Sequence, residues 1–320
     1  MYDAHYDLLT YLYFKMNKNN KYKDVDKLIK DISKIYNNNN ILGGIVNLYF
    51  MSKKEMLDLL DIKKDELKDI TIMLKESINN LNYMKKINVI PEDIDFIYSI
   101  EGCDYIKNIK ELEELYKLGI RSILPVWNNK NKYGSGIRYN KNLTKKGIKL
   151  IKKAIDLNMI IDLSHTCEKT YFDIINLVEK ERKNNKEIFI MASHSNSKTI
   201  CNVKRNLTDE QIIKLNTLGG YIGIVLHKDF LSNDNDKEKG LINQIIYIKD
   251  ILKFNPNKIL ISTDNMDFNT DSSRHNLTLY NINNINAYLR KLLEKYFDKE
   301  FIDNILVNNM KNLISKVKII

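Results

Sequence analysis

The chain has few of the residues that divide or cross-link a protein. Its 320 residues include only three prolines and eleven glycines, and no stretch rich in serine, glycine and proline separates one part from another. Residues 1–320 are therefore expected to form a single domain, a length that α/β barrels often reach. The three cysteines, Cys103, Cys167 and Cys201, are an odd number without CxxC spacing. This pattern excludes a disulfide framework and predicts reduced, buried thiols.

Long apolar segments are also lacking. No apolar run approaches the ~20 residues that a membrane-spanning helix needs. The first residues contain no basic stretch followed by an apolar one, so neither a signal peptide nor a membrane segment is predicted. A cytoplasmic protein is the expectation. No GxGxxG or P-loop pattern follows any apolar run, which argues against nucleotide binding.

The excess of positive charge is not concentrated in one place. The chain has 51 lysines and arginines against 41 acidic residues, a formal charge of +10, but lysine is spread along its whole length. No compact basic block with interleaved aromatic residues occurs. A solvated, lysine-rich surface explains this distribution better than a phosphate-binding stripe, so no nucleic-acid partner is predicted.

Short apolar runs alternate with longer amphipathic stretches. Alternation of this kind is typical of parallel βαβ units, and eight strands are the number that closes a barrel. The predicted fold class is α/β, a (β/α)8 TIM-like barrel, with an open doubly wound sheet as the alternative. The expected strands are Met1–His5, Ile41–Phe50, Ile94–Ile100, Arg121–Val126, Met159–Leu163, Ile188–Ala192, Gly220–Leu226 and Lys258–Thr263. The expected helices are Ser52–Lys86 with a Ser52/Glu55 capping box, Ile109–Leu118, Leu143–Asn158, Cys167–Asn184, Thr208–Leu218 and Leu241–Phe254, followed by a mostly helical remainder.

Histidines and carboxylates fall where these strands end. One such histidine is more often structural, and one such carboxylate is more often a helix cap, but here three of each coincide. In a barrel the carboxyl rim is where catalytic groups converge. Three imidazoles and three carboxylates there suit two borderline divalent cations with one bridging carboxylate. The six residues are His5, Asp7, Glu101, His165, His194 and Asp264. The remaining histidines, His227 and His275, are not needed for two metal shells and are expected not to be ligands.

At these residues the sequence resembles the membrane dipeptidase (renal dipeptidase) family of zinc peptidases. The motifs occur in the family's order from Tyr2 to about Phe268, whereas the carboxyl-terminal remainder matches only in helical character. The matching elements are His5-Tyr6-Asp7, Ile100-Glu101-Gly102, Asp162-Leu163-Ser164-His165, Ser193-His194-Ser195, Lys204-Arg205-Asn206 and the strand Gly219–Ile224.

The resemblance implies a metal-dependent hydrolase barrel that binds two divalent cations, with zinc as the expected metal, and cleaves dipeptides with a metal-bridging hydroxide. It also suggests a homodimer and a small-molecule substrate. Its implied ligands are His5 and Asp7 for one zinc, His165 and His194 for the other, and Glu101 between them.

Three further residues receive roles from the resemblance. Arg205 would hold the terminal carboxylate of the substrate, although a surface ion pair is its ordinary alternative. Asp264 would act as the catalytic acid and base. The stretch after Asp264 departs from the family's Gly-Ser-Asp-Phe-Asp-Gly pattern, and Trp127 stands where many members carry a histidine that steadies the oxyanion. Trp127 is expected to contact the substrate or to pack the rim, which leaves the oxyanion partner unassigned.

Two other functions stay open. One is an amidohydrolase acting on another small amide or on a modified peptide. The other is a metal-binding relative that has lost catalysis, which the altered stretch after Asp264 allows. A basic nucleic-acid-binding protein is the least supported, since no recognised motif for that function occurs.

Overall fold

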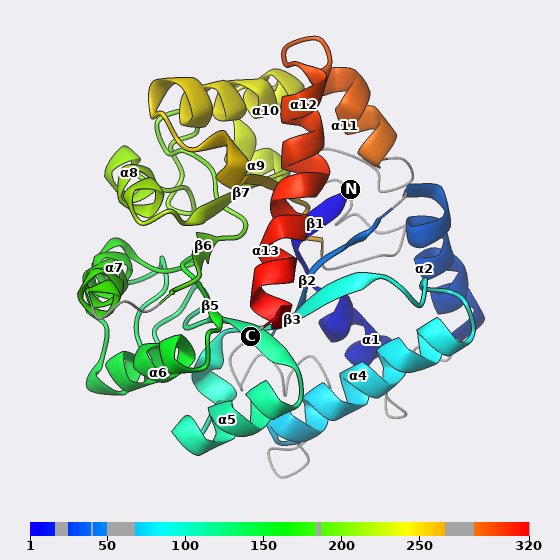
Figure 1. Ribbon diagram of the computed structural model, residues 1–320, viewed down its shortest axis with the longest axis vertical. Helices are drawn as coiled ribbons and strands as arrows, with labels where there is room; N and C mark the ends of the chain where they lie inside the picture. Colours follow the sequence, from blue (N-terminus) through cyan, green and yellow to red (C-terminus); the bar gives the residue numbers. More distant parts are fainter. Residues whose placement is uncertain (17–24, 40, 50–67, 184–186, 266–284, 320) are drawn as a thin grey trace.

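The computed structural model describes residues 1–16, 25–39, 41–49, 68–183, 187–265 and 285–319 (Figure 1). The predicted capping box of Ser52 and Glu55 lies outside the described residues. So do His275 and the part of the altered stretch that follows Asn265.

Eight parallel strands of the described chain form one sheet in chain order. They are β1 (Tyr2–Tyr6), β2 (Gly43–Tyr49), β3 (Asp95–Glu101), β4 (Ile120–Leu124), β5 (Ile160–Asp162), β6 (Ile190–Ala192), β7 (Tyr221–Val225) and β8 (Ile259–Ser262). The sheet curls into a barrel because the segment after β8 bonds to β1. The Asp264 amide donates to the His5 carbonyl at 3.0 Å, and the Asp7 amide donates to the Asn265 carbonyl at 2.9 Å. The barrel prediction is confirmed over the open sheet.

Every predicted strand is present, with ends that differ by one or two residues. The Gly-Gly pair in β2 is required by close packing against both neighbouring strands. A Cβ on Gly43 would lie 1.9 Å from the Asp95 carbonyl oxygen, and one on Gly44 would lie 2.0 Å from the Asp3 carbonyl oxygen. Both glycines also have a backbone φ of 147°, a conformation that residues with a side chain rarely adopt.

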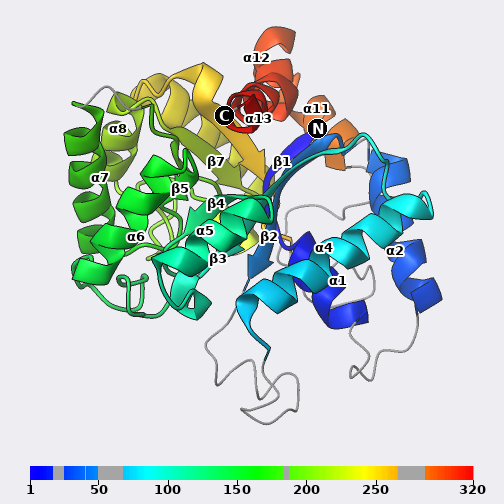
Figure 2. The ribbon, with the colours of Figure 1, turned by 60° about the horizontal axis from the view of Figure 1, so that its bottom comes forward.

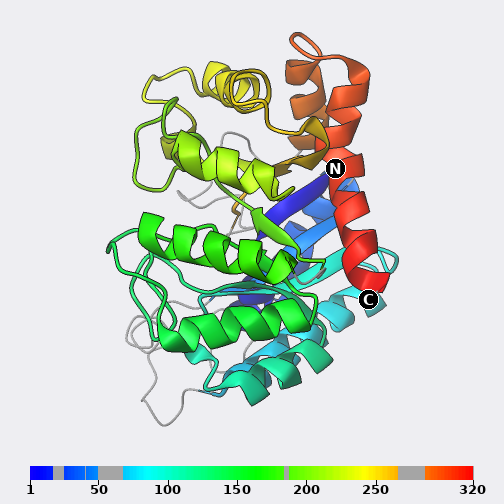
Figure 3. The ribbon, with the colours of Figure 1, turned by 60° about the vertical axis from the view of Figure 1, so that its left-hand side comes forward.

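The helices that follow the strands pack around the barrel (Figure 3). Their bounds are α1 (Leu8–Met16), α2 (Val25–Asn39), α4 (Ile70–Lys86), α5 (Ile109–Lys117), α6 (Lys145–Asp156), α7 (Glu168–Arg182), α8 (Asp209–Thr217), α9 (Lys228–Leu231), α10 (Lys237–Ile246), α11 (Ile285–Leu293), α12 (Lys299–Asp303) and α13 (Asn309–Ile319). Shorter turns are the 3-10 segments Cys103–Tyr105 and Pro256–Lys258 and the π-helical segments Tyr247–Ile251 and Asn304–Asn308.

Side-chain caps fix several helix starts. Thr144 caps α6 by accepting from the Gly147 amide, and Thr208 caps α8 in a full capping box with Gln211. The helix predicted at Leu241 starts earlier, at Lys237, because Asp236 caps it there. Helices α1 and α2 were not predicted from the sequence. The three cysteines are free and buried, as predicted.

The barrel interior differs between its two ends. At the amino ends of the strands the interior is apolar, and α13 covers it (Figure 2). Leu313, Ile314 and Val317 of α13 join the cluster formed by inward-facing strand residues such as Ile45 and Ile97. At the carboxyl ends the buried residues are polar, among them His5, Asn47, Glu101, Asp162, Ser193 and His194. The apolar end stabilises the barrel, and the polar end is where a site can form.

Candidate metal centre

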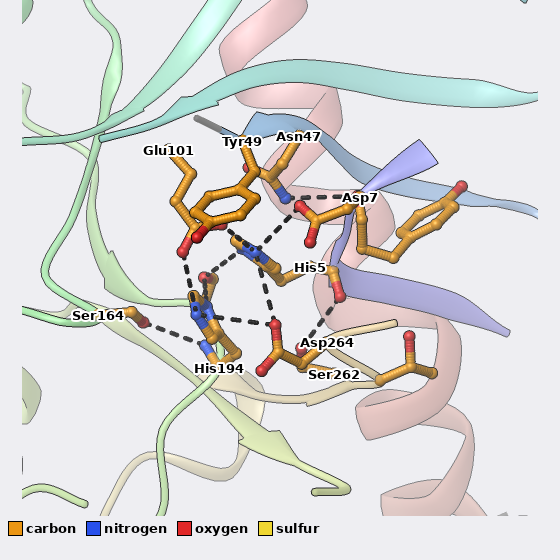
Figure 4. A network of polar contacts seen from close by, with 12 residues as sticks. His5, Asp7, Asn47, Tyr49, Glu101, Ser164, His194, Ser262 and Asp264 are labelled. Carbon is orange, nitrogen blue, oxygen red and sulfur yellow. Dashed lines mark hydrogen bonds and ion pairs between the residues drawn. The ribbon is translucent and has the colours of Figure 1, made fainter. Parts of the chain in front are cut away.

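The six predicted strand-end residues meet at the carboxyl mouth of the barrel. All of them except His165 are labelled in Figure 4. Glu101 is the last residue of β3 rather than the residue after it. The pairing register of β1 and β2 shifts between Asp3 and Tyr6, an irregularity of the kind that re-aims side chains at barrel rims. The six residues belong to five strands or to the segments directly after them. His5 lies in β1 and Glu101 in β3, whereas Asp7 follows β1, His165 follows β5, His194 follows β6 and Asp264 follows β8.

Glu101 lies at the middle of this group and divides its two oxygens between different partners. Its Oε2 is 2.9 Å from His5 Nε2. Its Oε1 is 3.0 Å from His165 Nε2 and 3.8 Å from His194 Nε2. The carboxylate therefore faces the His5 side with one oxygen and the His165/His194 side with the other, which is the arrangement of a bridging ligand.

The remaining donor atoms complete the two sides. His165 Nε2 and His194 Nε2 lie 2.9 Å apart. On the other side, Asp7 Oδ1 and Asp264 Oδ1 each lie 3.9 Å from His5 Nε2. Two sets of three residues could each hold a metal ion, because the donor atoms within each set lie within 4.8 Å of one another. One set is His5, Glu101 and His194, and the other is His5, Asp7 and Asp264. Imidazole nitrogen and carboxylate oxygen are the donors that zinc and similar cations take.

Each imidazole turns Nε2 to the centre and uses Nδ1 for a second contact. His165 Nδ1 is 2.8 Å from Asn128 Oδ1. His5 Nδ1 and His194 Nδ1 both contact Ser193 Oγ, at 3.1 and 2.7 Å. A hydroxyl oxygen has two lone pairs, so Ser193 can accept from both rings at once. Contacts of this kind fix the tautomer that leaves Nε2 free to bind a metal.

The charges at the centre fit a cation. Asp7 is buried, and its Oδ1 has no hydrogen-bond partner among the described residues. Burial, and then the negative charge of Glu101, raise the pKa of Asp7 well above its usual range. A buried carboxylate without a partner is costly unless a positive charge compensates it. A divalent cation between Asp7 and Glu101 would supply that charge.

The histidines divide into two electrostatic kinds. Burial disfavours the imidazolium of His5, but Glu101, Asp7 and Asp264 outweigh burial and raise the pKa of His5 to about 10. A positive charge is thus favoured where His5 Nε2 faces the carboxylates. Burial, and then Arg205, lower the pKa of His165 to about 4, and burial with His5 holds the pKa of His194 well below its usual range. These two rings are neutral, the form in which histidine binds a metal.

Asp264 differs from the other five in its exposure. Its side chain is 22% exposed, against 8% or less for His5, Asp7, Glu101, His165 and His194. Burial raises the pKa of Asp264 to about 6. Asp264 and His165 also have positive φ, 51° and 67°, a strained conformation that functional sites often hold. A carboxyl group that has a pKa close to neutral pH and is partly exposed at the carboxyl mouth is suited to proton transfer.

Arg205 is buried beside the histidines rather than placed on the surface. Its Nη2 donates to the His194 carbonyl at 2.8 Å and its Nη1 to Ser195 Oγ at 3.3 Å. Its buried Nε has no hydrogen-bond partner within the described part. The surface ion pair considered from the sequence is therefore wrong, and the charge of Arg205 acts on His165 and Asp264.

Trp127 packs on the rim beside His165. The two ring centroids are 5.9 Å apart, and the Tyr49 ring centroid lies 5.1 Å from that of the indole. The Arg138 guanidinium lies 5.8 Å from the indole centroid. Trp127 thus packs the rim as one of its two expected roles, and no oxyanion partner is identified at its position.

Two buried carboxylates that the sequence reasoning did not use hold the strand-end loops. Asp162 Oδ1 accepts from the Ser164 and Ser193 amides, both at 3.0 Å, and so ties the segments that carry His165 and His194. Asp3 Oδ1 accepts from the His5 amide at 3.1 Å and from the Thr263 amide at 3.0 Å. Their spacing from the histidines was the sequence signal that could have identified both as positioning residues. Asp162 lies three residues before His165, and Asp3 lies two residues before His5.

His227 lies at the same rim without joining the centre. It caps α9 by accepting from the Asp229 amide at 3.3 Å and stacks on Phe230 with centroids 4.1 Å apart. It belongs to neither group of close donor atoms among the described residues.

Within the described helices, none combines the length and the apolar character needed to cross a membrane.

Comparison with known proteins finds curated relatives that match about half of this chain. A protein in the pqqA 5' region of Klebsiella pneumoniae, itself uncharacterized, is 31% identical over 156 residues, which are 45% of this chain and 55% of that protein. The chain thus spans a little over half the length of that relative.

Solved structures share the fold. A metallo peptidase from Rhodobacter sphaeroides, liganded with a phosphinate mimic of the dipeptide L-Ala-D-Ala, superposes with a TM-score of 0.72 at 19% identity and covers 99% of this chain and 98% of its own. The probable dipeptidase PvdM from Pseudomonas aeruginosa gives a TM-score of 0.72 at 13% identity, covering 99% and 95%. The sequence model of the membrane dipeptidase family, peptidase family M19, matches residues 1–320, and the chain belongs to that family.

Proposed function

We propose that this protein hydrolyses the amide bond of dipeptides with two divalent cations, expected to be zinc, and that residues 1–320 act as one catalytic domain. The observation that carries the proposal is the division of the Glu101 carboxylate between His5 on one side and His165 with His194 on the other. Membership of the family supports metal-dependent hydrolysis. The proposed ligands are His5 and Asp7 for one cation, His165 and His194 for the other, and Glu101 for both.

The protein's own residues would bind, orient and move protons around the scissile bond. Two cations of this kind, when bound, would polarise the carbonyl and lower the pKa of a water molecule, so that hydroxide is available near neutral pH. Asp264 would take a proton from that water and deliver it to the leaving amine, since its carboxyl group has a pKa of about 6 and is partly open to the mouth. Ser193 and Asn128 would keep the three imidazoles oriented.

Arg205 favours a substrate with a free carboxylate. Its guanidinium is buried next to His194, and its Nε has no protein partner within the described part. A planar, permanently charged group of this kind binds carboxylates. The Rhodobacter sphaeroides relative holds a mimic of a dipeptide, which supports a substrate of the same size here. Trp127, which packs on His165, would contact the side chain of the substrate.

The test combines metal content with turnover for two variants. His165→Ala is expected to lose about one of two metals and nearly all hydrolysis. Asp264→Asn is expected to keep its metals and to lose on the order of 10²- to 10⁴-fold in kcat, the usual effect of removing an acid–base group. Glu210→Gln, at an exposed position of α8, is the matched control and should behave as wild type.

The outcomes separate the competing functions. The substrate panel would hold dipeptides of both stereochemistries and small non-peptide amides. Near-normal dipeptide hydrolysis by both variants would contradict the proposal. Hydrolysis of the non-peptide amides alone would favour the amidohydrolase, and bound metal without any turnover would favour the relative that has lost catalysis.

A further inference from the structure

A pocket lies at the opposite end of the barrel from the metal centre. It has a volume of about 370 Å³ and opens beside the amino ends of β6, β7 and β8. Its charged lining consists of Arg182 at the end of α7, Lys258 before β8, Lys316 of α13 and Glu187. Phe189 and Tyr221 supply aromatic walls.

The cations of this pocket have no matching set of carboxylates. Across the described residues, no carboxylate oxygen forms an ion pair with Arg182, Lys258 or Lys316, although other lysines of the protein form such pairs. Glu187 is the one acidic residue of the lining. Three cations and one carboxylate leave the pocket with a net charge of +2.

Two of the three cationic groups are held in place by the protein. Arg182 Nη1 donates to the Leu218 carbonyl at 2.6 Å and its Nη2 to the Ile188 carbonyl at 2.8 Å. Lys258 Nζ lies 3.9 Å from the centroid of the Tyr221 ring, a close cation–π contact. Because these groups are already oriented, a ligand would not have to order them.

The cations also repel one another. Burial first, and then the charges of Lys316 and Arg182, lower the pKa of Lys258, whereas Glu187 acts in the opposite direction. An anion bound among them would relieve this repulsion. A phosphate monoester carries a charge close to −2 at neutral pH and offers several strong acceptor oxygens, which match a net charge of +2 and three cationic donors.

We propose that this pocket, defined by Arg182, Glu187, Phe189, Tyr221, Lys258 and Lys316, binds the phosphate group of a small organic molecule. The phosphate lies among the three cations, and the organic part lies against Phe189 and Tyr221. Because the pocket lies at the amino end of the strands, the proposal does not depend on dipeptide hydrolysis.

The test is calorimetric titration of the metal-loaded protein with inorganic phosphate and with phenyl phosphate. Wild type is expected to bind one phosphate per chain, and phenyl phosphate more tightly than inorganic phosphate. Lys258→Met and Lys316→Met should each weaken binding by about tenfold, equal to roughly 1.4 kcal/mol. Lys149→Met, an exposed lysine of α6 away from the pocket, is the matched control and should leave binding unchanged.

A phosphate at the metal centre must be distinguished from one at this pocket. Arg205→Met should leave phosphate binding unchanged under the proposal. Binding that Arg205→Met abolishes and Lys258→Met preserves would overturn it, as would the absence of saturable binding by wild type. Lys316 is exposed, so Lys316→Met gives a result even if Lys258→Met reduces stability.

Discussion

The two mouths of this barrel are built from the same eight strands but have opposite chemistry. At the amino mouth, Leu313, Ile314 and Val317 of α13 bury apolar surface against the strand interior. At the carboxyl mouth, buried side chains are ionisable, and Asp7 Oδ1 and Arg205 Nε have no hydrogen-bond partner within the described part. One mouth stabilises the fold, and the other holds groups that would destabilise it unless a ligand compensates them.

Two of the five non-glycine residues with positive φ in the described part of the chain lie at the carboxyl mouth. His165 and Asp264 have positive φ at the carboxyl mouth, and the backbone there is held by buried carboxylates such as Asp162. Strain of this kind persists only where the surrounding structure fixes it. Substitutions of the metal-centre residues and of the apolar cluster under α13 should therefore affect different properties, metal binding with hydrolysis in the first case and stability in the second.

The largest effect is expected from Glu101→Gln. The change removes the charge that faces both histidine groups, so metal content should fall at both positions. Dipeptide kcat/KM should fall by on the order of 10³-fold, as for other losses of a central electrostatic group. Elemental analysis and steady-state kinetics provide the measurement. If Glu101→Gln kept two metals and wild-type turnover, Glu101 would not be needed for metal binding at the carboxyl mouth, and the contrast between the two mouths would be contradicted.

Leu313→Ala tests the opposite mouth. Leu313 is fully buried in α13, so truncation should lower the free energy of unfolding by roughly 2–5 kcal/mol. Metal content per folded chain should stay as in wild type, because none of the proposed metal ligands lies at this end. Urea denaturation and elemental analysis measure the two quantities. Loss of metal from the folded variant would show that the ends are not independent.

Asp162→Ala should have an intermediate effect on the metal centre. It removes the acceptor shared by the Ser164 and Ser193 amides, which position the segments of His165 and His194. Metal affinity is expected to fall by roughly 10- to 100-fold, as for other residues that orient ligands. Asp162→Asn keeps an acceptor oxygen and should restore most of the affinity in a competition titration with a chelator. Equal weakening by both substitutions would assign the effect to lost charge rather than to position.

The smallest effect concerns pH. Burial raises the pKa of Asp3 to about 6, above its usual value near 4. Between these values the native state binds the proton that the unfolded chain has released, so this group's contribution to stability falls as pH rises from about 4 to about 6. Asp3→Asn should remove this fall, by roughly 1.4 kcal/mol per pKa unit. Unfolding of chelator-treated wild type and variant across this range measures it, and parallel curves would contradict it.

The fold and the position of the centre follow from local patterns in the sequence. Seven of the strands correspond to apolar runs, the first is counted from the largely polar stretch Met1–His5, and each of the six acidic or imidazole residues follows or ends one of these strands. The parallel order of the strands then brings them to one mouth. Helix starts were predictable where a threonine could cap them, as at Thr144 and Thr208.

Contacts between distant segments were not predictable in this way. Asn128 contacts His165 across 37 positions, and Asp3 reaches the Thr263 amide across 260. No periodicity or spacing encodes such pairs, because they depend on the register of the closed barrel. Gly223 is similar: a Cβ there would lie 1.7 Å from the Ser193 carbonyl, a constraint that appears only once β6 and β7 are paired.

Diffraction from zinc-loaded crystals at wavelengths on either side of the zinc absorption edge tests the central claim most directly. We expect two anomalous peaks at the carboxyl mouth, one contacted by His5 and Asp7 and the other by His165 and His194, with one Glu101 oxygen facing each. A single peak, or peaks away from Glu101, would contradict the assignment of these five residues to a two-metal centre.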